Sequence, residues 1–162
     1  MDRIRIQAGF ACTALLALAA CAPINPASGP AATASGPPAC TAAAAGDPLV
    51  GNWLSVSAQQ GVAGAVRTLY TLNADGSMSY VEQVKRPRAP SQGLYESGCW
   101  SHAGQTLTLR TLASNGVPVN LDDPIYINRH RVEQVSTTEL HLSGPGGAVK
   151  ARRMSPGYRL PF

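Results

Sequence analysis

The chain has 162 residues, a formal net charge of +4 and only 14% charged residues, which allows one ordinary domain with appendages. Its nearest approaches to basic clusters are Lys85-Arg86-Pro87-Arg88 and Lys150-Ala151-Arg152-Arg153. A nucleic-acid-binding domain normally gathers more positive charge on one element. We therefore expect no nucleic-acid partner and interpret these runs as solvated loop and strand-edge charges.

Residues 1–20 have the plan of a secretory signal peptide. A short basic start, Met1 to Arg5, is followed by an apolar run of 13 residues from Ala8 to Ala20. A helix that spans a bilayer needs about 20 apolar residues, so this run is too short for a stable span. We expect it to be helical only in the precursor.

The apolar run ends in Leu18-Ala19-Ala20-Cys21, which closely resembles the lipobox of bacterial lipoproteins. The resemblance implies a diacylglyceryl group on Cys21, cleavage just before it, and acyl chains such as palmitate that hold the protein in the lipid bilayer. The alternative is ordinary cleavage after Ala20, with Cys21 free or disulfide-bonded. Residue 22 is Ala and not Asp, which by the enterobacterial sorting rule favours the periplasmic face of the outer membrane.

Residues 21–46 are expected to form the acylated cysteine and a flexible, disordered linker. Residues 22–46 contain no charged side chain, and 20 of the 25 are Ala, Pro, Gly or Ser. Five prolines and three glycines oppose a regular helix, and no alternation supports a strand. Residues 47–162 then form the folded domain with a short C-terminal tail.

From Asp47 onwards, short stretches with alternating apolar residues recur between turn signals, which predicts an all-β domain. Asn73-Ala74-Asp75-Gly76 is a hairpin turn, and the strand after it places Met78, Tyr80 and Glu82 on one face. Short connections predict antiparallel neighbours, and closing such a sheet removes its unpaired edges. We therefore predict a small up-and-down barrel, with a β-sandwich as the alternative. The eight expected strands are 51–57, 65–72, 77–84, 94–101, 106–112, 125–135, 139–142 and 148–154.

Three short stretches resemble lipocalin-like (calycin) barrels: Gly51-Asn52-Trp53, the hairpin from Tyr70 to Ser77, and Gly98-Cys99-Trp100 followed by Thr106 to Leu109. The resemblance implies that Trp53 packs at the closed end of the barrel under a basic side chain, supplied by Arg152 or Arg153. The alternative is that Trp53 and Trp100 are simply core aromatics. The sequence lacks the C-terminal helix of larger lipocalins.

Four cysteines are present, of which Cys12 leaves with the signal and Cys21 is expected to be acylated. Cys40 and Cys99 remain, and in an oxidising compartment they are candidates for a disulfide that closes a loop of about 60 residues. The alternative is a buried free Cys99, with Cys40 loose or paired between molecules.

No catalytic, metal or cofactor site is expected. His102, His130 and His141 lack close ligand spacing, although His130 and His141 are candidates for neighbours across two strands. Asp122-Asp123 is a local carboxylate pair, and no Gly-x-Ser-x-Gly or phosphate loop is present.

These features predict a monomeric, non-enzymatic envelope lipoprotein whose barrel binds a small apolar ligand or an envelope protein. The loops 86–93 and 113–124 are the candidate contacts, and the tail 155–162 is expected to cover one end of the barrel. The alternatives are a protease-inhibitor-like module and a purely structural envelope protein. An open interior of a few hundred Å³ favours the ligand carrier.

Overall fold

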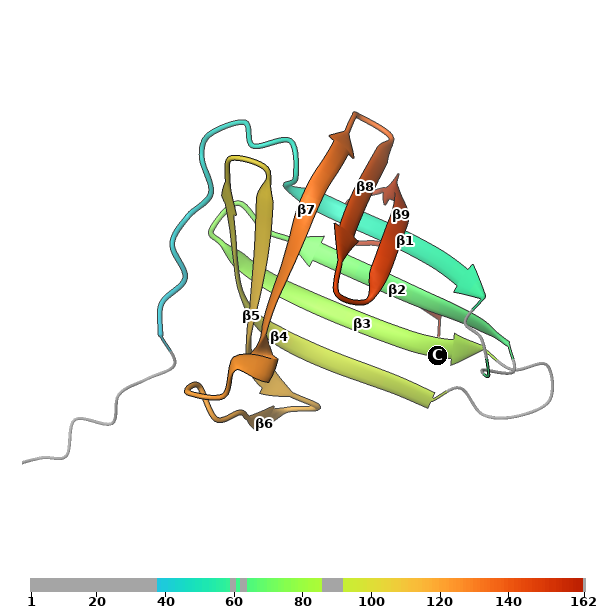
Figure 1. The fold of residues 1–162 in the computed structure, drawn as a ribbon, viewed down its shortest axis with the longest axis horizontal. Coiled ribbons are helices and arrows are strands. Elements are labelled where there is room, and N and C mark those ends of the chain that lie inside the picture. Colours follow the sequence, from blue (N-terminus) through green and yellow to red (C-terminus); the bar gives the residue numbers. More distant parts are fainter. Residues whose placement is uncertain (1–37, 59–60, 62–63, 86–91, 162) are drawn as a thin grey trace, which may run out of the picture. The chain divides into compact units, whose positions relative to one another are not determined.

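The computed structural model describes residues 38–58, 61, 64–85 and 92–161. These residues form one antiparallel sheet that closes on itself, because β4 pairs with β5 and β1 pairs with β9 (Figure 1). Eight strands make the barrel, and the two-residue strand β6 (Val117–Pro118) pairs only with β5. The barrel strands are β1 (Gly51–Ala58), β2 (Ala65–Leu72), β3 (Ser77–Lys85), β4 (Gln92–Ala103), β5 (Thr106–Ser114), β7 (Ile127–Val135), β8 (Glu139–Gly144) and β9 (Gly147–Met154).

The predicted eight-stranded up-and-down barrel is therefore confirmed, and the sandwich alternative is wrong. Most of the strands differ from the prediction by one or two residues at an end, and β6 lies within a predicted loop. Two of the differences have a local cause. Residues 124–126 form a 3-10 helix, η1 (Pro124–Tyr126), because Pro124 begins it and the carboxylate of Asp123 caps it. The turn expected over 143–147 is shorter, because β8 and β9 stay paired as far as Gly144 and Gly147.

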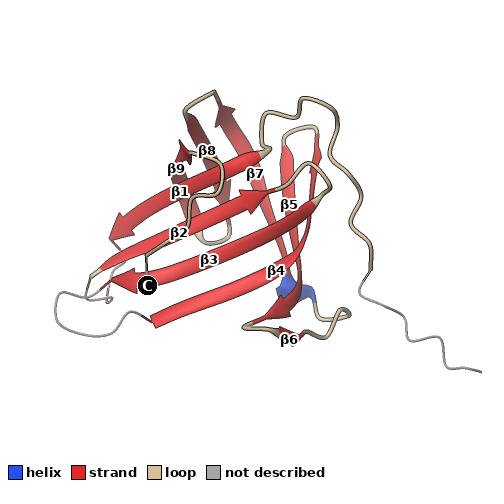
Figure 2. Ribbon diagram, turned by 180° about the vertical axis from the view of Figure 1, so that it is seen from behind, coloured by secondary structure: helices blue, strands red, loops and turns tan. Residues whose placement is uncertain are grey.

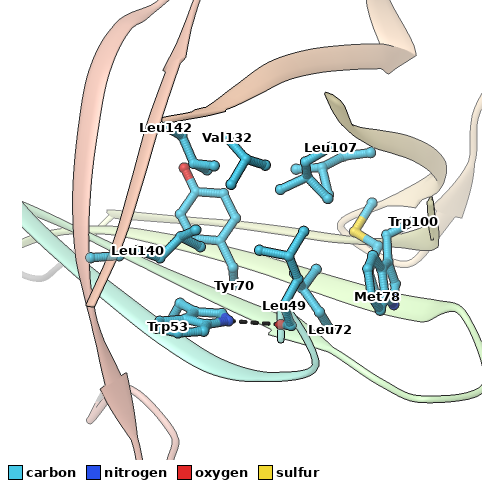
Figure 3. Packing of buried hydrophobic residues seen from close by; sticks show 12 residues of the cluster. Leu49, Trp53, Tyr70, Leu72, Met78, Trp100, Leu107, Val132, Leu140 and Leu142 are labelled. Carbon is cyan, nitrogen blue, oxygen red and sulfur yellow. Dashed lines mark hydrogen bonds between the residues drawn. The ribbon is translucent and has the colours of Figure 1, made fainter. Parts of the chain in front are cut away.

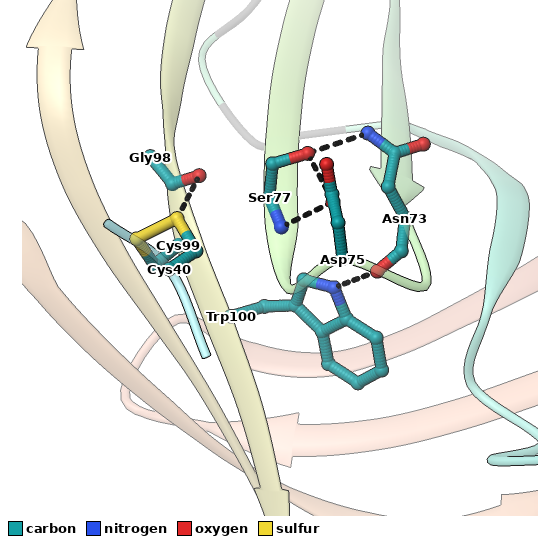
Figure 4. Close-up of a disulfide and its surroundings, with 7 residues drawn as sticks. All are labelled: Cys40, Asn73, Asp75, Ser77, Gly98, Cys99 and Trp100. Atoms are coloured by element: carbon teal, nitrogen blue, oxygen red, sulfur yellow. Dashed lines mark hydrogen bonds between the residues drawn. A yellow bond between two sulfur atoms is a disulfide. The ribbon is translucent and has the colours of Figure 1, made fainter. Parts of the chain in front are cut away.

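Inward-facing and outward-facing residues alternate along β2, which shows why the sequence forms this barrel. Val66, Thr68, Tyr70 and Leu72 are buried and face inward, while the residues between them face the outside. The following hairpin turn is stabilised by Asp75, whose carboxylate accepts hydrogen bonds from the backbone N–H and the hydroxyl of Ser77 (Figure 4). These bonds lower the pKa of Asp75.

One half of the barrel is filled by the main hydrophobic core (Figure 3). Leu49, Trp53, Leu107 and Leu140 are fully buried in it. The β2–β3, β4–β5 and β7–β8 turns lie at this end, because strand direction alternates around the barrel. We call it the closed end, and the opposite end, with the β8–β9 turn, the open end.

Residues 38–50 lie against the closed end. The backbone N–H of Ala43 donates to the carbonyl oxygen of Ala74 over 2.9 Å. Gly76 takes a φ of +81°, and a Cβ there would lie 1.9 Å from the carbonyl oxygen of Thr41. This close approach places the last part of the expected linker, residues 38–46, in contact with the barrel. Residues 22–37 of that linker lie outside the described residues.

The C-terminal tail lies across the outer face of β1, β2 and β3, and not over an end of the barrel as expected (Figure 2). Leu160 is 4% exposed and packs against Leu54 and Leu69, two outward-facing residues. The amide of Gln83 donates to the carbonyl oxygen of Pro161 over 2.8 Å. The tail therefore forms a second, smaller core on the outside of the sheet.

Candidate functional site

The open half of the barrel contains a cavity of about 760 Å³, which we call the cup. Its floor is the main core, reached at Met78 and Leu109, and the β8–β9 turn stands at its rim. The cup wall combines apolar and polar inward-facing side chains, namely Ser55, Ser57, Thr68, Tyr80, Glu82, Leu94, Glu96, Thr111, Asn128 and His130. A volume of this size lies in the range of small-molecule pockets.

Tyr80 and Glu82 form the polar centre of one wall. They are inward neighbours on β3, and the Tyr80 hydroxyl donates to a carboxylate oxygen of Glu82 over 2.7 Å. The rings of Tyr70 and Tyr80 meet edge to face, with centroids 5.3 Å apart. Burial, together with the charge of Glu82, raises the pKa of Tyr70 to about 12. Burial and the hydrogen bond to Glu82 raise the pKa of Tyr80 further still.

Glu96 lies directly across from Tyr80 in the β3–β4 register. One of its carboxylate oxygens accepts a hydrogen bond of 3.1 Å from the hydroxyl of Thr111, which is 1% exposed. The register of β4 against β5 shifts between Ser97 and Gly98, where a Cβ on Gly98 would lie 1.9 Å from the carbonyl oxygen of Arg110. The glycine therefore permits the bulge, next to which Glu96 enters the cup.

His130 enters the cup from β7. Its ring packs over Gly144, where a Cβ would lie 2.7 Å from the ring Nδ1. Burial lowers the pKa of His130, so the neutral imidazole is favoured at pH 7. Its Nδ1 is buried and has no hydrogen-bond partner among the described residues.

At the closed end, Trp53 and Arg153 form the predicted contact. The guanidinium carbon of Arg153 lies 4.1 Å from the ring centroid of Trp53. Its two terminal nitrogens donate to the carbonyl oxygens of Pro48 and Val50, each over 2.7 Å. A Cβ on Gly51 would lie 2.5 Å from one of these nitrogens, which explains the glycine two residues before Trp53. Arg152, the other candidate, is exposed and faces outward.

Cys40 and Cys99 form the disulfide expected from the sequence (Figure 4). The bridge joins the N-terminal segment to β4 close to the β2–β3 turn. Trp100 follows Cys99 and donates from its indole nitrogen to the carbonyl oxygen of Asn73 over 2.8 Å. The disulfide and this hydrogen bond together fix the segment and the turn at the closed end.

The remaining polar candidates are not brought together. His130 faces the cup, whereas His141 faces outward beside Glu139, at 3.7 Å. His102 lies 2.9 Å from the carboxylate of Asp47 at the closed end. Among the described residues no three His, Cys, Asp or Glu side chains form a group suited to a metal ion.

Some predicted features lie outside the described part of the chain. These are the signal segment, Cys21, and residues 86–91 of one candidate contact loop. The other candidate loop, 113–124, connects β5 to β7 at the open end. Within the described residues, no helix is long and apolar enough to cross a membrane.

Sequence reasoning placed Met78, Tyr80 and Glu82 on one face but did not recognise that face as the wall of a cavity. It also missed Glu96, Thr111 and the inward position of His130. The sequence did contain a signal for these residues. Several strands carry polar residues at inward positions in the half that lies nearer the open end of the barrel. Alternation along a strand identifies these inward positions once it is known which half of the strand lies at the open end.

No protein-family model matches this sequence, and no curated protein matches it either. Among solved structures, the chain is similar to a lipocalin-like protein from Bacteroides uniformis ATCC 8492. The two chains are 16% identical and the TM-score is 0.43, with 67% of this chain and 100% of the other covered.

Proposed function

We propose that this protein is a non-enzymatic binding protein of the bacterial envelope, which holds a small ligand with an apolar body in the cup. The observation that carries the proposal is the cup itself. It is a cavity of about 760 Å³ with an apolar floor and a few inward polar groups. Small-molecule sites in proteins commonly combine these features. Every barrel strand is paired on both sides, and β1 pairs with β9 over Asn52–Ser55 and Ala151–Met154.

We propose further that the protein is anchored to the outer membrane through acyl chains on Cys21. The lipobox-like sequence supports this part of the proposal. Since residues 38–50 lie against the closed end and Cys40 is bonded to Cys99, the expected linker to the anchor consists of residues 22–37. A chain of that length and composition would span about 20–25 Å as a flexible coil. The cup would then act close to a membrane surface.

Acyl labelling tests the anchor. The exported chain should incorporate labelled palmitate, and Cys21→Ser should abolish the incorporation while Cys12→Ser leaves it unchanged. Equal labelling of the Cys21→Ser chain would contradict the anchor without affecting the ligand site.

Ligand binding is tested with Nile red, a neutral apolar dye whose fluorescence rises in apolar surroundings. We expect saturable binding by the exported Cys21→Ser chain. The pair Ser57→Trp and Leu94→Trp, which places two indoles in the cup, should weaken binding at least about tenfold. The control pair, Val117→Trp and Ile125→Trp, adds the same groups at two positions that do not line the cup, where Val117 and Ile125 are 66% and 70% exposed. Equal binding by both pairs would contradict the proposal.

A further inference from the structure

The cup contains two acidic side chains, Glu82 on β3 and Glu96 on β4. In the β3–β4 register Tyr80 lies opposite Glu96, and Glu82 is the next inward residue after Tyr80. The two glutamates are therefore diagonal neighbours on one patch of wall. Both carboxylates therefore border the same part of the cup.

No arginine of the described residues lines the cup, and the cup wall includes one lysine and one histidine. Lys150 is exposed and alternates outward beside the inward-facing Ala151. His130 favours the neutral imidazole, because burial lowers its pKa. The described wall therefore carries two carboxylates without an inward-facing cation.

Each carboxylate also keeps acceptor capacity. Among the described residues, one oxygen of Glu82 accepts from Tyr80 and one oxygen of Glu96 accepts from Thr111. A carboxylate offers about four lone-pair sites, so both can accept further hydrogen bonds from a ligand. Hydrogen bonds between a cation and a carboxylate are stronger than neutral ones, and more so where water is excluded.

The neighbouring surfaces suit the rest of such a ligand. The rings of Tyr70 and Tyr80 stand beside the carboxylates, and aromatic faces attract organic cations. The floor at Met78 and Leu109 is apolar.

We infer that the ligand of the cup is an amphipathic organic cation, in which an ammonium group binds between Glu82 and Glu96 and an apolar body lies on the floor. This inference rests on the proposed ligand-binding function and gives its chemical class. It also explains why two acidic groups face inward in a protein whose net charge is positive.

Decylamine, decanol and decanoate test the inference, because they share one chain length and differ in head-group charge. Each is titrated against Nile red bound to the exported Cys21→Ser chain, below the concentration at which the probe itself aggregates. We expect decylamine to displace the dye at a concentration at least about tenfold lower than decanol, and decanoate to be the weakest. The double change Glu82→Gln and Glu96→Gln should reduce the preference for the amine over the alcohol to about twofold or less.

The matched control is the double change Glu133→Gln and Glu139→Gln, which removes two exposed carboxylates from the outer faces of β7 and β8. It changes the net charge by the same amount and should keep the full preference for the amine. Equal displacement by all three probes, or an unchanged preference in the cup variant, would overturn the cationic ligand while leaving the binding function intact. Failure of Nile red and all three probes to bind would overturn both.

Discussion

The hydroxyl of Tyr80 donates a 2.7 Å hydrogen bond to the carboxylate of Glu82 inside the open half of the barrel. This contact keeps the phenol protonated and holds the carboxylate against the cup wall. Tyr70 packs edge to face on the ring of Tyr80. Burial, together with the charge of Glu82, raises the pKa of Tyr70. The two tyrosines thus connect the packed closed half of the barrel to its hollow open half.

This arrangement predicts a loss of stability in alkali. The pKa of Tyr70 is raised to about 12, whereas the unfolded phenol ionises near 10. The unfolded state therefore loses its proton first, and the stabilisation present below pH 10 is lost as the pH rises from 10 to 12. Tyr70→Phe should reduce the fall in the free energy of unfolding between pH 9 and pH 11, measured in urea. An unchanged fall in the Tyr70→Phe variant would contradict the assignment.

The closed end depends on Arg153 and not on its neighbour. Arg153→Met removes the contact with Trp53 and both hydrogen bonds to backbone carbonyls, which should lower the free energy of unfolding by about 2–3 kcal/mol. Arg152→Met makes the same change at an exposed position and should alter it by less than about 0.5 kcal/mol. Chemical denaturation measures both, and similar losses in the two variants would refute this account of the closed end.

Loss of the disulfide should destabilise the whole barrel. Replacing Cys40 and Cys99 with serine releases a loop of about 60 residues, which the chain-entropy model values at about 4 kcal/mol. The N-terminal segment should also leave the β2–β3 turn, so that amide exchange at Ala43 becomes fast. Unchanged urea midpoints and continued protection of Ala43 would show that the segment is held without the bridge.

The C-terminal tail is predicted to be part of the folded structure. Leu160 is 4% exposed, so Leu160→Ala removes buried side-chain atoms and should lower the free energy of unfolding by about 2–4 kcal/mol. Ile125→Ala, at a residue that is 70% exposed, is the control and should cost less than about 0.5 kcal/mol. If both variants melt like the parent chain, the small outer core does not contribute to stability.

Most of the barrel could be predicted from the sequence, because alternation and turn residues act locally. Asp75 and Gly76 mark the β2–β3 hairpin, and inward Val66 and Tyr70 establish the face of β2. The position of residues 38–46 could not be predicted in this way. It depends on the approach of Thr41 to Gly76, a contact that exists only once the barrel has formed.

The cup was missed for a related reason. Glu82 and Glu96 are ordinary strand residues when each strand is considered alone, and only the β3–β4 register makes them neighbours. The course of the tail had a usable signal in the outward apolar residues Leu54 and Leu69, which predict a covered outer face.

The most direct measurement of ligand binding in the cup is an NMR titration of the exported Cys21→Ser chain labelled with ¹³C at the methionine methyl groups. Met78 lines the cup floor, whereas Met154 packs with the tail on the outside of the barrel. Addition of Nile red should shift the Met78 resonance saturably and leave the Met154 resonance in place. A shift of Met154 alone, or equal shifts of both resonances, would contradict binding in the cup.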